Sequence, residues 1–143
     1  MSVGENALLA TSGAAVRKIG LVLLLAGANT VATAEWIKIG SSDVVTVYAD
    51  PATIRRAGTL AQMWDLFDFK SVQTMDGWSF LSAKNWVEYD CKDARWRNLQ
   101  ISHYAGNKGG GKRVYNNSKP GDWDAVTMDS AIGTKWKLVC AKR

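Results

Sequence analysis

The sequence predicts an α+β domain, a single antiparallel β-sheet of about five to six strands with one C-terminal α-helix. Segments of β-branched and aromatic residues follow one another from residue 43 to residue 104, separated by turn signals such as Asp76-Gly77. The last segment instead carries apolar residues at helical spacing. With 143 residues, 2 Pro and 13 Gly, the chain has the composition and length of one globular domain.

The first predicted strand covers Asp43–Ala49, which is rich in β-branched residues. It is expected to end before Pro51, because proline cannot continue a ladder of hydrogen bonds. Residues 51–56 are expected to form one short helical turn that Gly58 stops. A second, long apolar and aromatic strand is expected over Thr59–Lys70.

Two further strands, Trp78–Asp90 and Arg95–Tyr104, are expected to pair as a hairpin. Alternation places aromatic residues on both faces of the first strand. In the second strand it places Leu99, Ile101 and His103 on one face and Trp96, Asn98 and Tyr104 on the other. Residues 105–113 are rich in glycine and predict a mobile hairpin tip before a short strand at Val114-Tyr115.

The C-terminal segment fits two patterns. Ile132, Trp136, Val139 and Cys140 follow helical spacing, whereas Trp136, Leu138 and Cys140 also fit the alternation of a strand. Asp129 or Ser130 can cap a helix N-terminus, and basic residues follow near the end. We therefore interpret this segment as a helix.

Residues 1–34 are predicted to be a secretory signal peptide, and residues 35–143 the mature domain. Arg17 and Lys18 precede the ten-residue apolar run 19–28 and the small-residue triplet 32–34. A membrane-spanning helix needs about 20 apolar residues, so this ten-residue run is not interpreted as one. No transmembrane segment is expected in the mature chain either. The protein is expected to be exported to the periplasm or the outer cell surface.

Cys91 and Cys140 are the only cysteines, and export places them where thiols are oxidised. A disulfide between them is therefore predicted, and it would tether the helix to the sheet. One histidine and two cysteines cannot form a His/Cys metal cluster without outside ligands, so neither a metal site nor a cofactor is expected.

No catalytic residue is predicted. His103 is the only histidine, no nucleophile motif presents a serine, and His103 is interpreted as a packed strand residue. Residues 106–112 match the spacing of a phosphate-binding loop, but Arg113 stands where Ser or Thr is required, and no helix is expected to follow. Nucleotide binding is thus excluded, and export argues against nucleic acid.

Binding is the favoured function. Lys108, Lys112 and Arg113 lie on the glycine-rich loop with no acidic residue nearby, in a chain of formal net charge +5, which favours a protein or acidic polymer as partner. Three of the seven tryptophans sit where strand or helix packing explains them: Trp36, Trp64 and Trp136. Three others are not explained by a one-sided core and are predicted to contribute to a binding face: Trp86, Trp96 and Trp123.

The alternative function is that of a periplasmic carbohydrate-binding or glycan-processing protein. Trp86, Trp96 and Trp123 would then be stacking platforms, with Asp122 and Asp124 close by.

The order of short motifs resembles the surface-adhesin protein E family of Gram-negative bacteria. The motifs are Trp36, the strand and turn Val47–Ile54, Met63–Leu66, Glu88–Cys91, the glycine-rich segment Tyr104–Gly111, Trp123 and the Ser-capped segment that ends at Cys140. The resemblance implies a sheet of about six strands with a disulfide-tethered C-terminal helix. It also implies adhesin-like binding of host matrix and plasma proteins, plasminogen or haem, and pairing into homodimers. No residue here matches a binding motif for those ligands, and no cysteine lies near the cleavage site for lipid attachment.

Overall fold

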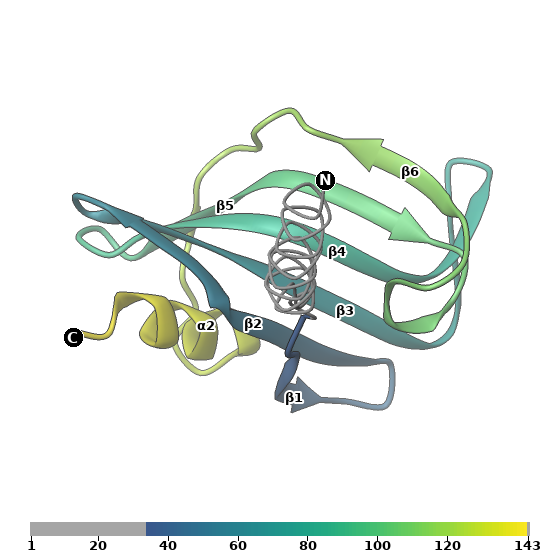
Figure 1. The fold of residues 1–143 in the computed structure, drawn as a ribbon, viewed down its shortest axis with the longest axis horizontal. Helices are drawn as coiled ribbons and strands as arrows, with labels where there is room; N and C mark the ends of the chain where they lie inside the picture. Colours follow the sequence, from purple (N-terminus) through teal and green to yellow (C-terminus); the bar gives the residue numbers. More distant parts are fainter. Residues whose placement is uncertain (1–33, 143) are drawn as a thin grey trace, which may run out of the picture. The chain divides into compact units, whose positions relative to one another are not determined.

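The computed structural model describes residues 34–142, so the predicted signal peptide falls, except for Ala34, outside the described residues. They form one antiparallel sheet whose six main strands lie in chain order, with one helix against it (Figure 1). The elements are β1 (Ile37–Ser41), β2 (Val45–Ala57), β3 (Leu60–Met75), β4 (Trp78–Asp90), β5 (Arg95–Tyr104), β6 (Arg113–Asn117), the two-residue β7 (Asp124–Ala125) paired with β5, and α2 (Ala131–Cys140). The predicted fold class is confirmed.

Strands β4 and β5 have the predicted bounds, and the turn Asp76-Gly77 has positive φ at both residues, as a tight hairpin requires. The helical turn predicted for residues 51–56 is wrong, because β2 continues to Ala57. Its ladder with β3 is interrupted between Asp50 and Arg55. Pro51, which has no N–H to donate, therefore lies in the unpaired part of an extended strand.

A bulge at Leu99 reverses the alternation of β5. Gln100 pairs with Trp86, but Asn98 pairs with Val87, so Leu99 is the extra residue. Trp96 consequently pairs with Tyr89 and lies on the opposite face from Tyr104. The predicted grouping of Trp96 with Tyr104 is wrong, and Trp86 and Trp96 do not share a face.

Helix α2 covers one face of the sheet, at the end that holds the β2–β3 and β4–β5 turns (Figure 1). Between α2 and the sheet lies a buried core, to which the strands contribute Ala49, Ala61, Met63, Val87 and Tyr89 and the helix contributes Val139. The Ser130 hydroxyl caps the helix by accepting from the Gly133 N–H, and the Cys91–Cys140 disulfide holds its end with the Cα atoms 5.5 Å apart. The helical interpretation and the disulfide are both confirmed. No helix within residues 34–142 has the length and apolar character needed to span a bilayer.

Candidate functional site

The sheet face opposite α2, called the open face below, carries a pair of tryptophans at its centre. Trp64 on β3 and Trp86 on β4 are directly paired across the ladder, and their ring centroids lie 5.3 Å apart with planes inclined at 42°. Both side chains are half-buried. Trp64 was expected in the core, but Met63 and Asp65 take that side of β3 and Trp64 projects to the other.

Three cationic side chains surround this pair. The Arg55 guanidinium lies 5.9 Å from the Trp86 ring centroid, and Lys84 Nζ lies 5.3 Å from that of Tyr104. Lys108 Nζ lies 5.7 Å from the ring centroid of Tyr48. Within residues 34–142 none of the three cations forms an ion pair. The open face is therefore locally positive and aromatic.

Two acidic side chains on the open face, Glu88 and Asp68, are already bonded within the chain, and a third, Asp50, lines the cleft described below. Glu88 accepts from Gln62 and forms an ion pair of 2.8 Å with Arg97. Asp68 Oδ1 accepts from the side-chain amide of Asn107 and from the Lys108 N–H. The carboxylates of Glu88 and Asp68 consequently offset little of the charge on Arg55, Lys84 and Lys108.

The glycine-rich loop turns back over β3 and β4 instead of extending beyond the sheet (Figure 1). The Ser82 hydroxyl donates to the Gly106 carbonyl over 2.6 Å and accepts from the Gly109 N–H over 2.8 Å. Gly109 has φ +73°, and a Cβ there would collide with Lys84 Cε. Glycine thus lets the loop pack on Lys84, so the predicted mobile tip is a folded part of the open face.

The binding residues predicted on that loop have different surroundings. Lys108 lies over the sheet beside Tyr48, whereas Lys112 and Arg113 are exposed where the chain enters β6. The loop therefore extends the positive charge of the open face toward one edge of the sheet.

The three tryptophans predicted as one binding face do not all lie on the same face of the sheet. Trp86 lies on the open face, but Trp96 packs against the core beneath α2. The guanidinium groups of Arg95 and Arg97 lie 4.8 and 4.4 Å from the ring centroid of Trp123, so cations already occupy its ring surface. Trp86 lies within the cationic and aromatic cluster, and Trp123 contacts Arg97, whose ion-pair partner Glu88 is also on the open face.

A cleft of about 310 Å³ opens on the open face beside Trp64. Its lining residues are Ala34, Trp36, Asp50, Thr53, Trp64, Lys84, Gln100, Ser102 and Tyr104. Sequence reasoning missed this cleft because it assigned Trp36 and Trp64 to the core. The available signal was the alternation of β3, which puts Trp64 on the opposite side from Met63 and Asp65.

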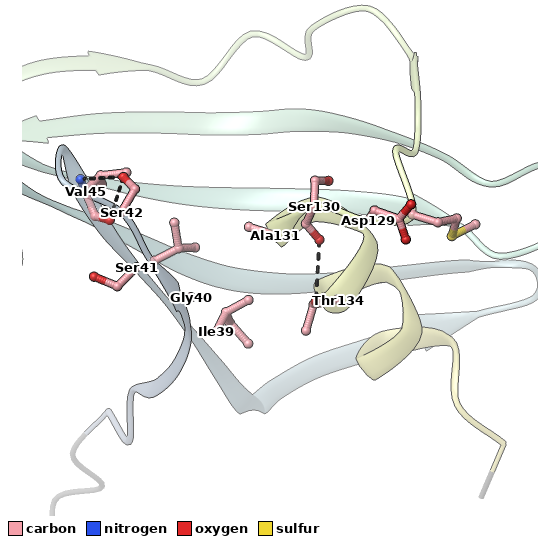
Figure 2. Close-up of a pocket in the computed structure, with 11 residues that line it drawn as sticks. Ile39, Gly40, Ser41, Ser42, Val45, Asp129, Ser130, Ala131 and Thr134 are labelled. Atoms are coloured by element: carbon pink, nitrogen blue, oxygen red, sulfur yellow. Dashed lines mark hydrogen bonds between the residues drawn. The ribbon is translucent and has the colours of Figure 1, made fainter.

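A larger groove of about 600 Å³ lies between the β1–β2 turn and the start of α2 (Figure 2). Ile39, Val45, Val47 and Met128 give it apolar walls, and Asp129 is its one charged lining residue. Its hydroxyls bond within the chain, since Thr134 donates to the Ser130 carbonyl and Ser42 Oγ accepts from Val45 N–H. The groove contains no residue of the predicted site. Within residues 34–142, no three His, Cys, Asp or Glu side chains gather closely enough to hold a metal ion.

His103 lies on the same sheet face as α2, near the end of β5 that is far from the helix. It is buried, as predicted for a packed residue. Trp78 Nε1 donates to its Nδ1 over 3.0 Å, and its ring stacks on Phe80 with centroids 3.9 Å apart. Tyr115 contacts the same cluster, with its ring centroid 5.0 Å from that of His103. Burial lowers the pKa of His103 below its ordinary value, which keeps the imidazole neutral as an acceptor.

This arrangement predicts that acidification destabilises the protein before carboxylates titrate. Because the pKa of His103 is lower in the folded state, the unfolded chain binds more protons and the free energy of unfolding falls as pH drops from 7 to 5. Urea unfolding across this range measures the slope. His103→Asn retains an oxygen acceptor for Trp78 and removes the titration, so its profile should be flatter. Identical slopes in both proteins would contradict the role of His103.

The described residues thus form a small disulfide-tethered sheet with one helix-covered face and one basic, aromatic face. The family model described as surface-adhesin protein E matches residues 36–141. The chain belongs to the surface-adhesin protein E family, as its motifs predicted.

Two solved structures of protein E from Haemophilus influenzae share the fold. One, crystal form II, has a TM-score of 0.59 at 13% identity and covers 78% of this chain and 91% of that one. The other, from a non-typeable strain, has a TM-score of 0.53 at 14% identity, with coverages of 78% and 79%. No curated protein matches the chain.

Proposed function

We propose that the protein is an exported, non-enzymatic binding module that recognises an acidic polymer or an acidic protein surface through the open face and the basic loop. One observation carries the proposal: Arg55, Lys84 and Lys108 stand without ion pairs within residues 34–142 around the half-buried Trp64 and Trp86. Aromatic residues and arginine are enriched at interfaces, and the lysines add positive charge that attracts an acidic partner. The description of the family as surface adhesins supports a binding role.

Direct binding tests this proposal. The protein is passed over immobilised heparin and over extracellular-matrix proteins, and Lys112→Ser with Arg113→Ser should weaken heparin binding by about tenfold, or about 1.4 kcal/mol. The matched control is Lys137→Ser with Lys142→Ser, which removes two exposed charges from α2 and the residues after it. It should change the affinity by less than about twofold, because these lysines are not in the basic loop. Equal losses in both variants would mean that only net charge matters.

Export is part of the proposal. The Cys91–Cys140 disulfide suits an oxidising compartment, and the family description places its members at the surface. Cell fractionation with sequencing of the mature N-terminus tests it, and Glu35 as the first residue is expected. Unprocessed protein in the cytoplasm would contradict export, and processed protein confined to the periplasm would contradict host adhesion.

Carbohydrate recognition is the second candidate function, and the cleft beside Trp64 supports it. Asp122 and Asp124, the carboxylates predicted to serve it, line a separate groove with Trp96 and Asn98. Both are exposed, and Asp124 belongs to β7, where it pairs with Trp96 of β5. We therefore propose recognition of a glycan and no reaction on it.

A further inference from the structure

We propose that the cleft on the open face binds a ring of an acidic saccharide, of which a uronate is the simplest example. This inference rests on the proposed function and specifies its acidic ligand. Three features of the cleft lead to it: aromatic walls, hydrogen-bonding groups with free capacity, and a cation without an ion pair among the described residues.

The aromatic walls come from three separate segments. Trp36 precedes β1, Trp64 lies on β3 and Tyr104 ends β5. They surround about 310 Å³, at the small end of the size range of ligand pockets, about 300–1,000 Å³. A pyranose ring has a flat C–H face and a rim of hydroxyls, so it can lie against an indole while its rim meets polar groups.

The polar lining has capacity for hydroxyls that both donate and accept. Asp50 is buried, and its Oδ1 accepts from the Ala52 N–H, while Oδ2 accepts no hydrogen bond within residues 34–142. Ser102 Oγ donates to Asn116 Oδ1, which leaves its own oxygen able to accept. Gln100 adds an amide whose carbonyl oxygen is not used by any donor of the described residues. These groups suit neighbouring sugar hydroxyls, with Asp50 as an acceptor.

Asp50 and Lys84 are the two charged residues that line the cleft, and they form no ion pair with each other, so a ligand carboxylate is accommodated at Lys84 while Asp50 faces hydroxyls. Lys84 lines it and has no carboxylate partner within residues 34–142, so a ligand carboxylate gains a charge-assisted hydrogen bond there. Arg55 and Lys108 stand on the same face beyond the cleft, where further acidic units of a chain would meet them. A neutral sugar can accept hydrogen bonds from Lys84 but gains no ion pair from these three cations.

The test compares three probes with the full exported protein: an oligogalacturonate, a neutral malto-oligosaccharide of equal length, and an oligoglutamate of equal charge. Tryptophan fluorescence and calorimetry report binding. The oligogalacturonate is expected to bind at least about tenfold more tightly than the neutral sugar. Oligoglutamate, which has charge and no sugar ring, should leave the fluorescence unquenched. Equal binding and quenching by oligoglutamate would overturn the proposal, as would equal affinity for the neutral sugar.

Variants then locate the site. Trp64→Leu should weaken binding of both saccharides by about tenfold through loss of stacking, and Lys84→Met should weaken the oligogalacturonate by a larger factor than the neutral sugar. Trp123→Leu is the control, because that ring is covered by Arg95 and Arg97, and its affinity should stay within about twofold. Thermal melting verifies that each variant is folded. If Trp64→Leu does not fold, the affinities of Lys84→Met for the two saccharides test the cleft proposal.

Failure here is distinguishable from failure of the proposed function. If heparin binding depends on Lys112 and Arg113 but neither Trp64→Leu nor Lys84→Met alters saccharide affinity, the basic loop binds and the cleft proposal is overturned. If no acidic probe binds at all, both are overturned.

Discussion

Replacing Lys135 by methionine is expected to lower the free energy of unfolding by about 3–5 kcal/mol, the cost of leaving one partner of a buried ion pair alone. Lys135 on α2 is 2% exposed, and its Nζ lies 2.5 Å from Oδ2 of Asp65, which is 1% exposed. The second carboxylate oxygen accepts from Asn85 Nδ2 over 2.8 Å. Methionine fills the volume of the lysine stem, so the fall in the free energy of unfolding reports the loss of the lysine charge and not a loss of packing.

The double variant Lys135→Met with Asp65→Asn provides the control. The amide introduced by Asp65→Asn would keep an oxygen for the Asn85 side chain and would carry no charge, so most of the loss should be recovered. Urea unfolding of the wild type, both single variants and the double variant gives the free energies of a double-mutant cycle, and hence the interaction energy between Lys135 and Asp65. A double variant as unstable as Lys135→Met would show that lost packing, and not the buried carboxylate, causes the effect.

The same polar cluster contains a hydroxyl without a partner. Tyr89 is fully buried, and its Oη makes no hydrogen bond within residues 34–142. Burial, and secondarily the charge of Asp65, raise the pKa of Tyr89 above its ordinary value. The hydroxyl is therefore protonated at neutral pH, and it adds no charge to the Asp65–Lys135 pair.

Local signals account for the elements that the sequence predicted well. β4 begins after an Asp-Gly turn and β5 follows a tight connection, and α2 starts at a serine that does cap it. β1 was given no bounds, because the extent of a five-residue edge strand depends on its pairing with β2. The strand was predicted to end before Pro51, and this was wrong because the gap in the ladder that accommodates the proline is formed by pairing with β3, a different part of the chain.

The open face could be predicted only in part, for the same reason. The bulge at Leu99 is defined by pairing with β4, and it alone separates Trp96 from Trp86. The glycine-rich loop is held by Asp68 and Ser82, which are distant in sequence, so composition indicated a mobile tip instead. Positive charge on the loop was readable from the sequence, and its position over the sheet was not.

Removing the disulfide is expected to have an effect of similar size to that of Lys135→Met. Cys91 follows β4 and Cys140 ends α2, with a sequence separation of 49. Closing a loop of that length stabilises the folded state by about 4 kcal/mol in the chain-entropy model. Cys91→Ser with Cys140→Ser should therefore lower the free energy of unfolding by about that amount, as measured by urea denaturation.

Contacts other than the disulfide also hold α2 on the sheet. The double cysteine variant therefore tests whether the disulfide stabilises the protein by restricting the unfolded chain or by holding the native helix. Trp136 Nε1 donates to the Asp90 carbonyl, and Arg56 Nε donates to the Val139 carbonyl. If the disulfide acts on the unfolded chain, the variant keeps its helix and near-UV spectrum, and its urea m-value rises because the unfolded state is more expanded. Wild-type protein reduced with dithiothreitol should match the variant. A lost near-UV signal with an unchanged m-value would instead mean that the disulfide holds α2 onto the native sheet.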